Sequence, residues 1–276
     1  MALVPFPSQS AQRRPDDEPD WDDDPDDGSG GKMSFLEHLD ELRKRIIWSV
    51  SGLGIGVLIA FFYIGTIFDF IMRPMQRMLP PGQTLIYTDP SEAFMLQIKI
   101  ALIAGLIVAS PMVFAQIWLF IAPGLYQHEK KLAIPFVVMS TVLFVSGAAF
   151  SHYAVFPLVW RFFASFTTDY LTYMPRVEPA FSIYLRLILA LGITFQLPTV
   201  VLFLARMGMI TPRFMIRNFK YAILLIIIAS AVLSPDGGGV GMVVMGAPVV
   251  ILYILSIGLA WMFGKRRRTD DDAAEA

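Results

Sequence analysis

Six long apolar stretches are the feature of this sequence that most limits what it can fold into. About 20 apolar residues are needed to cross the roughly 30 Å of hydrocarbon in a bilayer. An apolar segment in lipid must also satisfy its own backbone polar groups, which a helix does. We therefore predict an all-α, polytopic membrane protein with six transmembrane helices. The stretches cover residues 46–68, 100–122, 132–156, 187–205, 221–233 and 240–263.

The last two stretches differ from the others. The fifth holds about 13 uninterrupted apolar residues, and the sixth contains Gly241, Gly246 and Pro248. The turn sequence SPDGGG at residues 234–239 joins them. Such a pair crosses a bilayer only where the bilayer is thin or neighbouring helices shield it. We predict that the fifth and sixth helices are short and form a hairpin.

Four of the apolar stretches contain a proline. These prolines lie in the second, third, fourth and sixth, at Pro111, Pro135, Pro198 and Pro248. A proline in a helix removes one backbone hydrogen bond and bends the helix. The predicted helices are therefore interrupted and bent, which suits a curved, concave bundle.

Composition divides the chain into a membrane domain and two tails. The chain is 55% hydrophobic and 16% charged, outside the usual range of soluble domains. Residues 1–32 are acidic and proline-rich and are predicted to be a disordered tail, while 265–276 form a charged C-terminal tail. The six helices occupy residues 33–264. The absence of cysteine excludes disulfides and thiolate metal sites.

The distribution of lysine and arginine predicts the orientation. With both termini in the cytoplasm, about fourteen of these residues lie inside and four outside. The two long outer loops, 69–94 and 157–183, carry apolar residues at helical spacing. These residues either lie against the membrane as amphipathic segments or pack onto helix ends. They are Phe70, Ile71, Met75, Met78, Phe162, Phe163, Phe166 and Leu171.

Motifs of several enzyme classes are missing. No GxxxxGK[ST], HExxH or GxSxG pattern occurs, and His38, His128 and His152 lie in separate segments. We therefore expect no enzymatic activity, no metal and no cofactor, and we place His152 near the outer interface. A small-solute secondary transporter is the alternative function, but such proteins have repeated halves, and none is evident here.

The run SFLEHLDELRKRI, residues 34–46, precedes the first apolar stretch. Ser34 and Glu37 have capping-box spacing, so a helix should start here and continue into the membrane. Glu41 and Arg45 are four residues apart in the favourable order. Their charges either form a self-paired, solvated surface or bind a ligand.

A second cluster, IAPGLYQHEKKL at residues 121–132, favours a ligand. Glu129 is the only acid in this short loop, which is predicted on the same side of the membrane as Glu41. Two carboxylates held on rigid helices match two adjacent arginines, because each can accept a forked pair of hydrogen bonds. The pattern indicates a di-arginine peptide.

These motifs resemble the TatC family of the twin-arginine protein translocase. The resemblance rests on FLEHLDELRKRI, FIAPGLYQHEKK, FQLP and SPD, in this order, and covers about residues 33–264. It implies a concave, six-helix receptor in the bacterial inner (cytoplasmic) membrane, with both termini cytoplasmic. Such a receptor binds twin-arginine signal peptides of folded proteins, and transport uses the proton-motive force.

The resemblance also implies partners and the roles of single residues. The expected partners are the single-span TatA and TatB proteins, membrane lipids and further copies of the chain, without nucleic acid. Glu41, Arg43 and Arg45 would form the N-terminal part of the recognition surface. Phe120 and Glu129 would form the part contributed by the first cytoplasmic loop.

Two further positions match family motifs, and a third departs from one. Pro74, in the first outer loop, and Asp236, in the SPD turn, match positions tied to activity. Gln196 departs from the family, which often has glutamate at this place in the fourth span. Glutamine donates and accepts hydrogen bonds but carries no charge or proton. We therefore hypothesise that polarity at Gln196, rather than ionisation, is what function needs; the alternative is a purely structural interhelical hydrogen bond.

Overall fold

The structure, a computed structural model, describes residues 35–77, 79, 84–121, 133–168, 170, 174–234 and 238–263. The chain divides into two units, residues 1–40 and 41–276. Of the first unit, only residues 35–40 are described, and they are helical. The elements are α1 (Phe35–Phe62), α2 (Ile64–Gln76), α3 (Pro90–Ile121), α4 (Ala133–Phe150), a π-helical turn η3 (Ser151–Val155), α5 (Phe156–Ala164), α6 (Val177–Thr194), α7 (Leu197–Arg206), α8 (Pro212–Arg217), α9 (Phe219–Leu233) and α10 (Gly239–Phe263).

Five helical segments are long and apolar enough to cross a membrane. They are Leu36–Phe62, Pro90–Ile121, Ala133–Ala164, Val177–Arg206 and Gly239–Phe263. The sixth apolar helix, α9, has 15 residues, which is about 22 Å at 1.5 Å per residue. The predicted membrane helices are thus confirmed, and the fifth is short as predicted.

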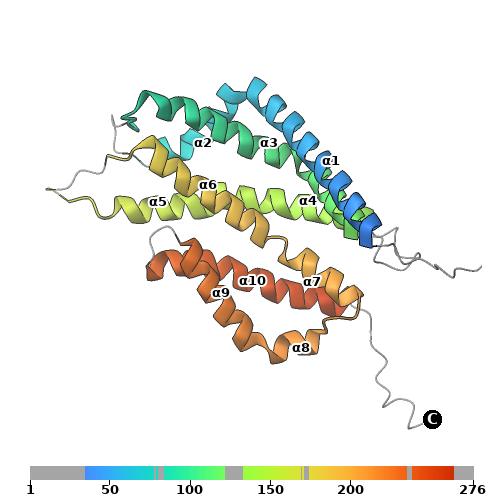
Figure 1. The fold of residues 1–276 in the computed structure, drawn as a ribbon. Coiled ribbons are helices and arrows are strands. Elements are labelled where there is room, and N and C mark those ends of the chain that lie inside the picture. Colours follow the sequence, from blue (N-terminus) through green and yellow to red (C-terminus); the bar gives the residue numbers. More distant parts are fainter. Residues whose placement is uncertain are drawn as a thin grey trace, which may run out of the picture. The chain divides into compact units, whose positions relative to one another are not determined.

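The sixth helix is not short, and this part of the prediction is wrong. α10 runs unbroken for 25 residues with Pro248 inside it. Gly246 lies where α9 comes close to α10: a Cβ there would lie 3.1 Å from the Ser230 hydroxyl oxygen. α10 packs along both α9 and α7 (Figure 1).

Of the four prolines expected to interrupt the membrane helices, one adjoins a break. Pro111 and Pro248 lie inside continuous helices. Pro135 lies in the first turn of α4, where no backbone hydrogen bond is lost. Pro198 lies at the start of α7, just after the break that separates α7 from α6.

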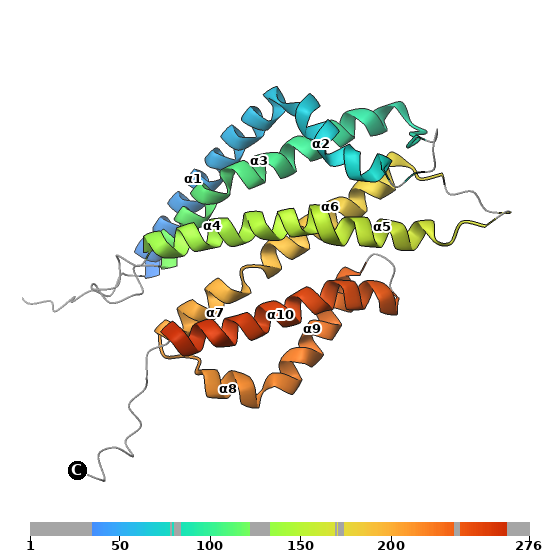
Figure 2. The same cartoon turned by 180° about the vertical axis from the view of Figure 1, so that it is seen from behind.

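The third membrane segment is continuous across the π-helical turn η3. α4, η3 and α5 follow one another without a gap, and Figure 2 shows α4 and α5 as one rod. Wide turns of this kind inside α-helices occur often at functional sites. Here the turn carries His152, whose side chain is buried against neighbouring helices; its place near the outer interface stays a prediction.

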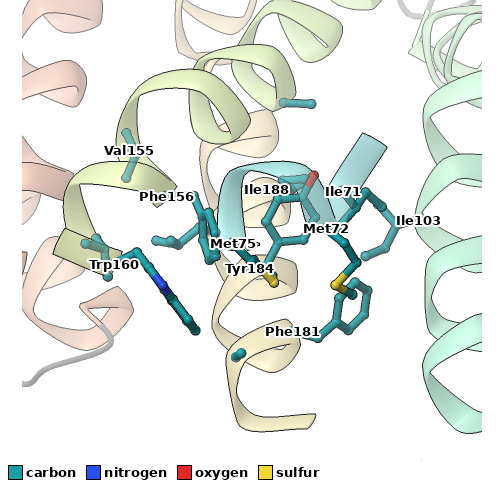
Figure 3. Close-up of a cluster of buried hydrophobic side chains, with 14 of the residues drawn as sticks. Ile71, Met72, Met75, Ile103, Val155, Phe156, Trp160, Phe181, Tyr184 and Ile188 are labelled. Carbon is teal, nitrogen blue, oxygen red and sulfur yellow. The ribbon is translucent and has the colours of Figure 1, made fainter. Parts of the chain in front are cut away.

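The main apolar core joins α2, α3, η3, α5 and α6. Met75 of α2, Phe156 of α5 and Tyr184 of α6 are almost fully buried and face one another (Figure 3). Ile71 and Met75 therefore pack onto other helices, as one of the two interpretations of the first outer loop predicted. Burial of aromatic and aliphatic side chains in this way fixes α2 against the spanning helices.

Two pairs of helices meet at glycines. A Cβ on Gly105 of α3 would lie 2.6 Å from the backbone nitrogen of Val57 in α1. A Cβ on Gly147 of α4 would lie 2.8 Å from the carbonyl oxygen of Leu191 in α6. Small residues let backbones approach this closely in membranes, where dispersion contacts rather than water expulsion hold helices together.

The segments that precede α3 and α6 pair through their backbones. Ile86 and Arg176 form an isolated parallel β-bridge. The N–H of Val177 donates to the carbonyl of Ile86 at 2.9 Å, and the N–H of Ile86 donates to the carbonyl of Pro175 at 3.3 Å.

Candidate functional site

The ion pair expected from the spacing of Glu41 and Arg45 is present. The Arg45 Nη2 donates to Glu41 Oε1 at 3.0 Å along α1. Nη1 of the same guanidinium donates to Gln116 Oε1 on α3 at 3.3 Å. The Arg45 and Glu41 side chains are only 27% and 16% exposed. Arg45 therefore links α1 to α3 instead of lying free on a solvated face.

Two polar atoms of the Glu41–Arg45 pair take no part in these hydrogen bonds. Glu41 Oε2 and Arg45 Nε are buried and have no hydrogen-bond partner among the described residues. A buried polar atom without a partner costs about 1–3 kcal/mol, so most such atoms in folded proteins are paired. The pair thus has one acceptor and one donor for which the described part of the chain supplies no partner.

The other residues expected at this site lie as follows. Arg43 is exposed, and none of the ion pairs among described residues includes it. Phe120 is half-buried in the last turns of α3, four residues after Gln116 and hence on the same face of that helix. Glu129 lies outside the described residues. The sequence alone did not identify Gln116. Its spacing of four residues from Phe120 could have indicated that both lie on one face of the helix.

Gln196 lies at the break between α6 and α7. Its Nε2 donates to the backbone carbonyl of Ser140 in α4 at 2.9 Å. The hydroxyl of Ser140 accepts a hydrogen bond from Trp118 Nε1 in α3 at 2.8 Å. Three membrane segments therefore meet in one polar chain, and the sequence had indicated only its first member.

Aromatic rings surround this polar chain. The Trp118 ring stacks on Phe136 with centroids 4.7 Å apart and meets Phe203 of α7 edge to face at 5.1 Å. Aromatic pairs of this kind contribute about 0.5–1.5 kcal/mol beyond their buried area. The rings exclude water from the Ser140 hydroxyl, which strengthens its hydrogen bond with Trp118.

Two further predicted positions have different outcomes. Pro74 lies inside α2 and is half-buried, between the buried residues Ile71 and Met75. Its position indicates a part in packing α2. Asp236 lies outside the described residues.

Charged pairs at the start of α3 and α6 were not predicted. Glu92 of α3 bonds the guanidinium of Arg176, which precedes α6. Lys99 of α3 bonds Glu178 of α6 at 3.1 Å.

The start of α3 is capped by Asp89. Its Oδ1 accepts hydrogen bonds from the backbone N–H of Ser91 at 2.8 Å and from the Ser91 hydroxyl at 2.7 Å. The bond from the Ser91 N–H stabilises the charged form, so the pKa of the Asp89 carboxyl lies below its ordinary value. Pro90 in the first helical position completes a typical helix start.

Histidine does not form a metal site in the described part of the chain. No group of three or more histidine, aspartate or glutamate side chains there could hold a metal ion. His152 instead shares a 2.9 Å hydrogen bond between Nδ1 and the Tyr184 hydroxyl, and its ring stacks on Phe70 at 4.3 Å.

Comparison with known proteins decides the family. The sequence model of the Sec-independent protein translocase protein (TatC) matches residues 37–248. The chain belongs to the TatC family. TatC of Koribacter versatilis is 41% identical over 248 residues, covering 88% of this chain and 91% of that protein. TatC of Aquifex aeolicus is 36% identical over 238 residues, covering 86% of this chain and 98% of that protein.

A solved TatC has the same fold. The crystal structure described as the twin arginine translocase receptor TatC in DDM superposes with a TM-score of 0.73 at 37% identity. It covers 81% of this chain and 99% of the crystallised chain. The resemblance inferred from the sequence motifs is thus confirmed. This member of the family is a multi-pass membrane protein, and its relatives are named as components of a protein translocase.

Proposed function

We propose that this TatC is the receptor subunit that binds twin-arginine signal peptides of folded proteins. The observation that carries the proposal is Glu41 Oε2, which has no hydrogen-bond partner among the described residues. A solved relative is described as a twin arginine translocase receptor. Neither Glu129 nor Asp236 is among the described residues, so their part in the proposal rests on the sequence motifs.

The geometry around Glu41 suits one arginine of the peptide. Arg45 occupies only Oε1 of this carboxylate, and Gln116 holds the second guanidinium nitrogen of Arg45. Since no described residue donates to Oε2, this oxygen can accept an N–H from an incoming guanidinium. A charge-assisted hydrogen bond of this kind is worth about 1.5–3 kcal/mol, or roughly tenfold in affinity for each 1.4 kcal/mol.

The second arginine is assigned to Glu129. Phe120 lies on α3 just before the loop that carries Glu129 and would pack on side chains that flank the arginine pair. Arg43, which is exposed on the same helix as Glu41, would contact acidic or backbone oxygen atoms of the peptide. Lysine cannot replace arginine here because its ammonium cannot form a forked bond.

The proposal extends to the assembly and its orientation. The receptor would act with single-span TatA- and TatB-type partners, several copies assembling together, and use the proton-motive force. It would lie in the bacterial inner membrane with both termini in the cytoplasm, where Glu41 and Glu129 meet the signal peptide before transport. The charge bias of the loops supports this orientation.

Peptide binding tests the proposal. Purified protein is titrated with a fluorescent signal peptide that has two arginines and with one that has two lysines. We expect at least tenfold tighter binding of the arginine peptide. The double variant Glu41→Gln with Glu129→Gln should lose this preference, while the control Asp40→Asn, an acid on the same helix, should retain it. Unchanged preference in the double variant would exclude the proposed site.

A further inference from the structure

An apolar groove lies between α5 and the first turns of α10. Its volume is about 260 Å³. The starting turns of α10 run beside α5, as Figure 2 shows. One lining residue is charged and the others are apolar or glycine. The groove is lined by Arg161 together with Leu158, Phe162, Val240, Gly241 and Val244.

The groove lies near the ends of two membrane segments. Arg161 is three residues before the end of the segment Ala133–Ala164, and Val240 is the second residue of the segment Gly239–Phe263. The ends of membrane segments are where hydrocarbon gives way to headgroups. A lipid at that depth would place its tails beside the apolar wall and its phosphate near Arg161.

Arg161 is available to an anion. Its side chain is exposed, and the ion pairs among described residues do not include it. Arginine binds phosphate oxygens through its planar fork, and its aliphatic part packs on apolar surface. The N-terminus of α10 lines the same groove, and its helix dipole adds a positive potential.

We infer that this groove binds an anionic phospholipid, with part of one acyl chain between α5 and α10 and the headgroup phosphate on Arg161. The lining favours a lipid: its apolar wall suits an acyl chain, and its one charged residue, Arg161, suits a phosphate. The inference does not depend on signal-peptide binding.

Native mass spectrometry of the full chain in detergent tests the inference. The probes are dioleoyl phosphatidylglycerol, dioleoyl phosphatidylcholine, dihexanoyl phosphatidylglycerol and inorganic phosphate. The variants are Arg161→Gln, which removes the charge, Arg161→Lys, which keeps it, and Leu158→Trp, which fills the groove from an exposed position. Arg186→Gln is the control, because this exposed arginine of α6 does not line the groove.

We expect the unchanged protein to bind dioleoyl phosphatidylglycerol about tenfold more tightly than dioleoyl phosphatidylcholine. Arg161→Gln should abolish this preference, Arg161→Lys should keep part of it, and Leu158→Trp should weaken both long-chain lipids. The control should match the unchanged protein. Preference surviving in Arg161→Gln would overturn the inference. So would equal binding of the dihexanoyl lipid, which would leave no role for the groove, or competition by inorganic phosphate, which would indicate a free-anion site.

Discussion

Gln196 donates its side-chain amide N–H to the backbone carbonyl of Ser140, with 2.9 Å between Nε2 and the oxygen. Gln196 lies where the fourth membrane segment breaks into α6 and α7, and Ser140 lies inside α4. The bond therefore fixes the broken end of one segment to the middle of another. An interhelical bond at this residue was one of the two interpretations of the sequence, and the geometry favours it.

Substitutions of Gln196 should show whether transport needs a polar side chain or a charged one at this position. Gln196→Leu removes the bond to Ser140 and should lower the free energy of unfolding by about 1 kcal/mol, the usual size of such a bond in membranes. It should also reduce export of a folded reporter. Gln196→Glu should export the reporter about as well as the unchanged protein. Thr194→Val is the matched control, because the Thr194 hydroxyl bonds the Ala190 carbonyl of its own helix. A severalfold gain in Gln196→Glu, with no loss in Gln196→Leu, would contradict the hypothesis.

Gly105 should tolerate no larger side chain. A Cβ at this position would lie 2.6 Å from the backbone of Val57, so α1 and α3 must separate. We expect Gly105→Val to cost at least about 1–3 kcal/mol, the usual cost of overpacking, seen as a lower unfolding temperature in detergent. Gly54→Ala, where a Cβ meets nothing within 4 Å, should be neutral or stabilising. Equal stability of the two variants would refute the close packing.

The pair His152 and Tyr184 should contribute to stability through its hydrogen bond. Tyr184→Phe keeps the ring but leaves the buried His152 Nδ1 without its 2.9 Å partner. A buried polar group left in this way costs about 1–3 kcal/mol. Tyr153→Phe serves as control because its side chain is 68% exposed. Thermal unfolding of both variants should show a loss only in Tyr184→Phe; losses of equal size would mean that the bond contributes little.

The two ion pairs near the starts of α3 and α6 should differ in strength. Glu92, bonded to Arg176, has a side chain only 10% exposed, whereas Glu178, bonded to Lys99, is 43% exposed. Solvent weakens exposed pairs to about 0–1 kcal/mol. We expect Glu92→Gln to cost more than Glu178→Gln, and only the second loss to disappear in 1 M salt. Unfolding curves at two salt concentrations measure this, and the reverse order would contradict the assigned burial.

Asp89 should make stability depend on pH in the acid range. Its carboxyl pKa is lower in the folded protein than its ordinary value because the Ser91 N–H and hydroxyl donate to it. The charged cap therefore stabilises the fold fully above about pH 3.9, the unfolded value, and this contribution is lost as pH falls through the lower folded pKa. Asp89→Ala should unfold more easily than the unchanged protein at pH 6, and the difference should shrink at pH 3. A difference independent of pH would rule out the charge as the cause.

Most of the helical layout was predictable because the bilayer imposes it. Each apolar stretch became helical, two of them with a break, and the short α9 followed from its short apolar run. The length of α10 was not predictable from Gly246 and Pro248, since its continuity depends on packing against α7 and α9. A single sequence does not show which helices will pack against one another.

The site was predictable only where its residues are close in sequence. Spacing alone indicated the pair Glu41 and Arg45, because four residues make one helical turn. Gln116 is 71 positions from Arg45, and Ser140 is 56 positions from Gln196. No local pattern reports which residues meet across helices, so these partners became visible only in the folded structure.

The backbone bridge between Ile86 and Arg176 limits where this protein can flex. Together with the ion pairs Glu92–Arg176 and Lys99–Glu178, it holds the beginning of α3 against the beginning of α6. Those two helices must then move as one body at that end. We expect any hinge between α6 and α7 to lie instead at Phe195 and Gln196, where the Gln196 N–H donates to the Ile193 carbonyl and not to the carbonyl four residues back.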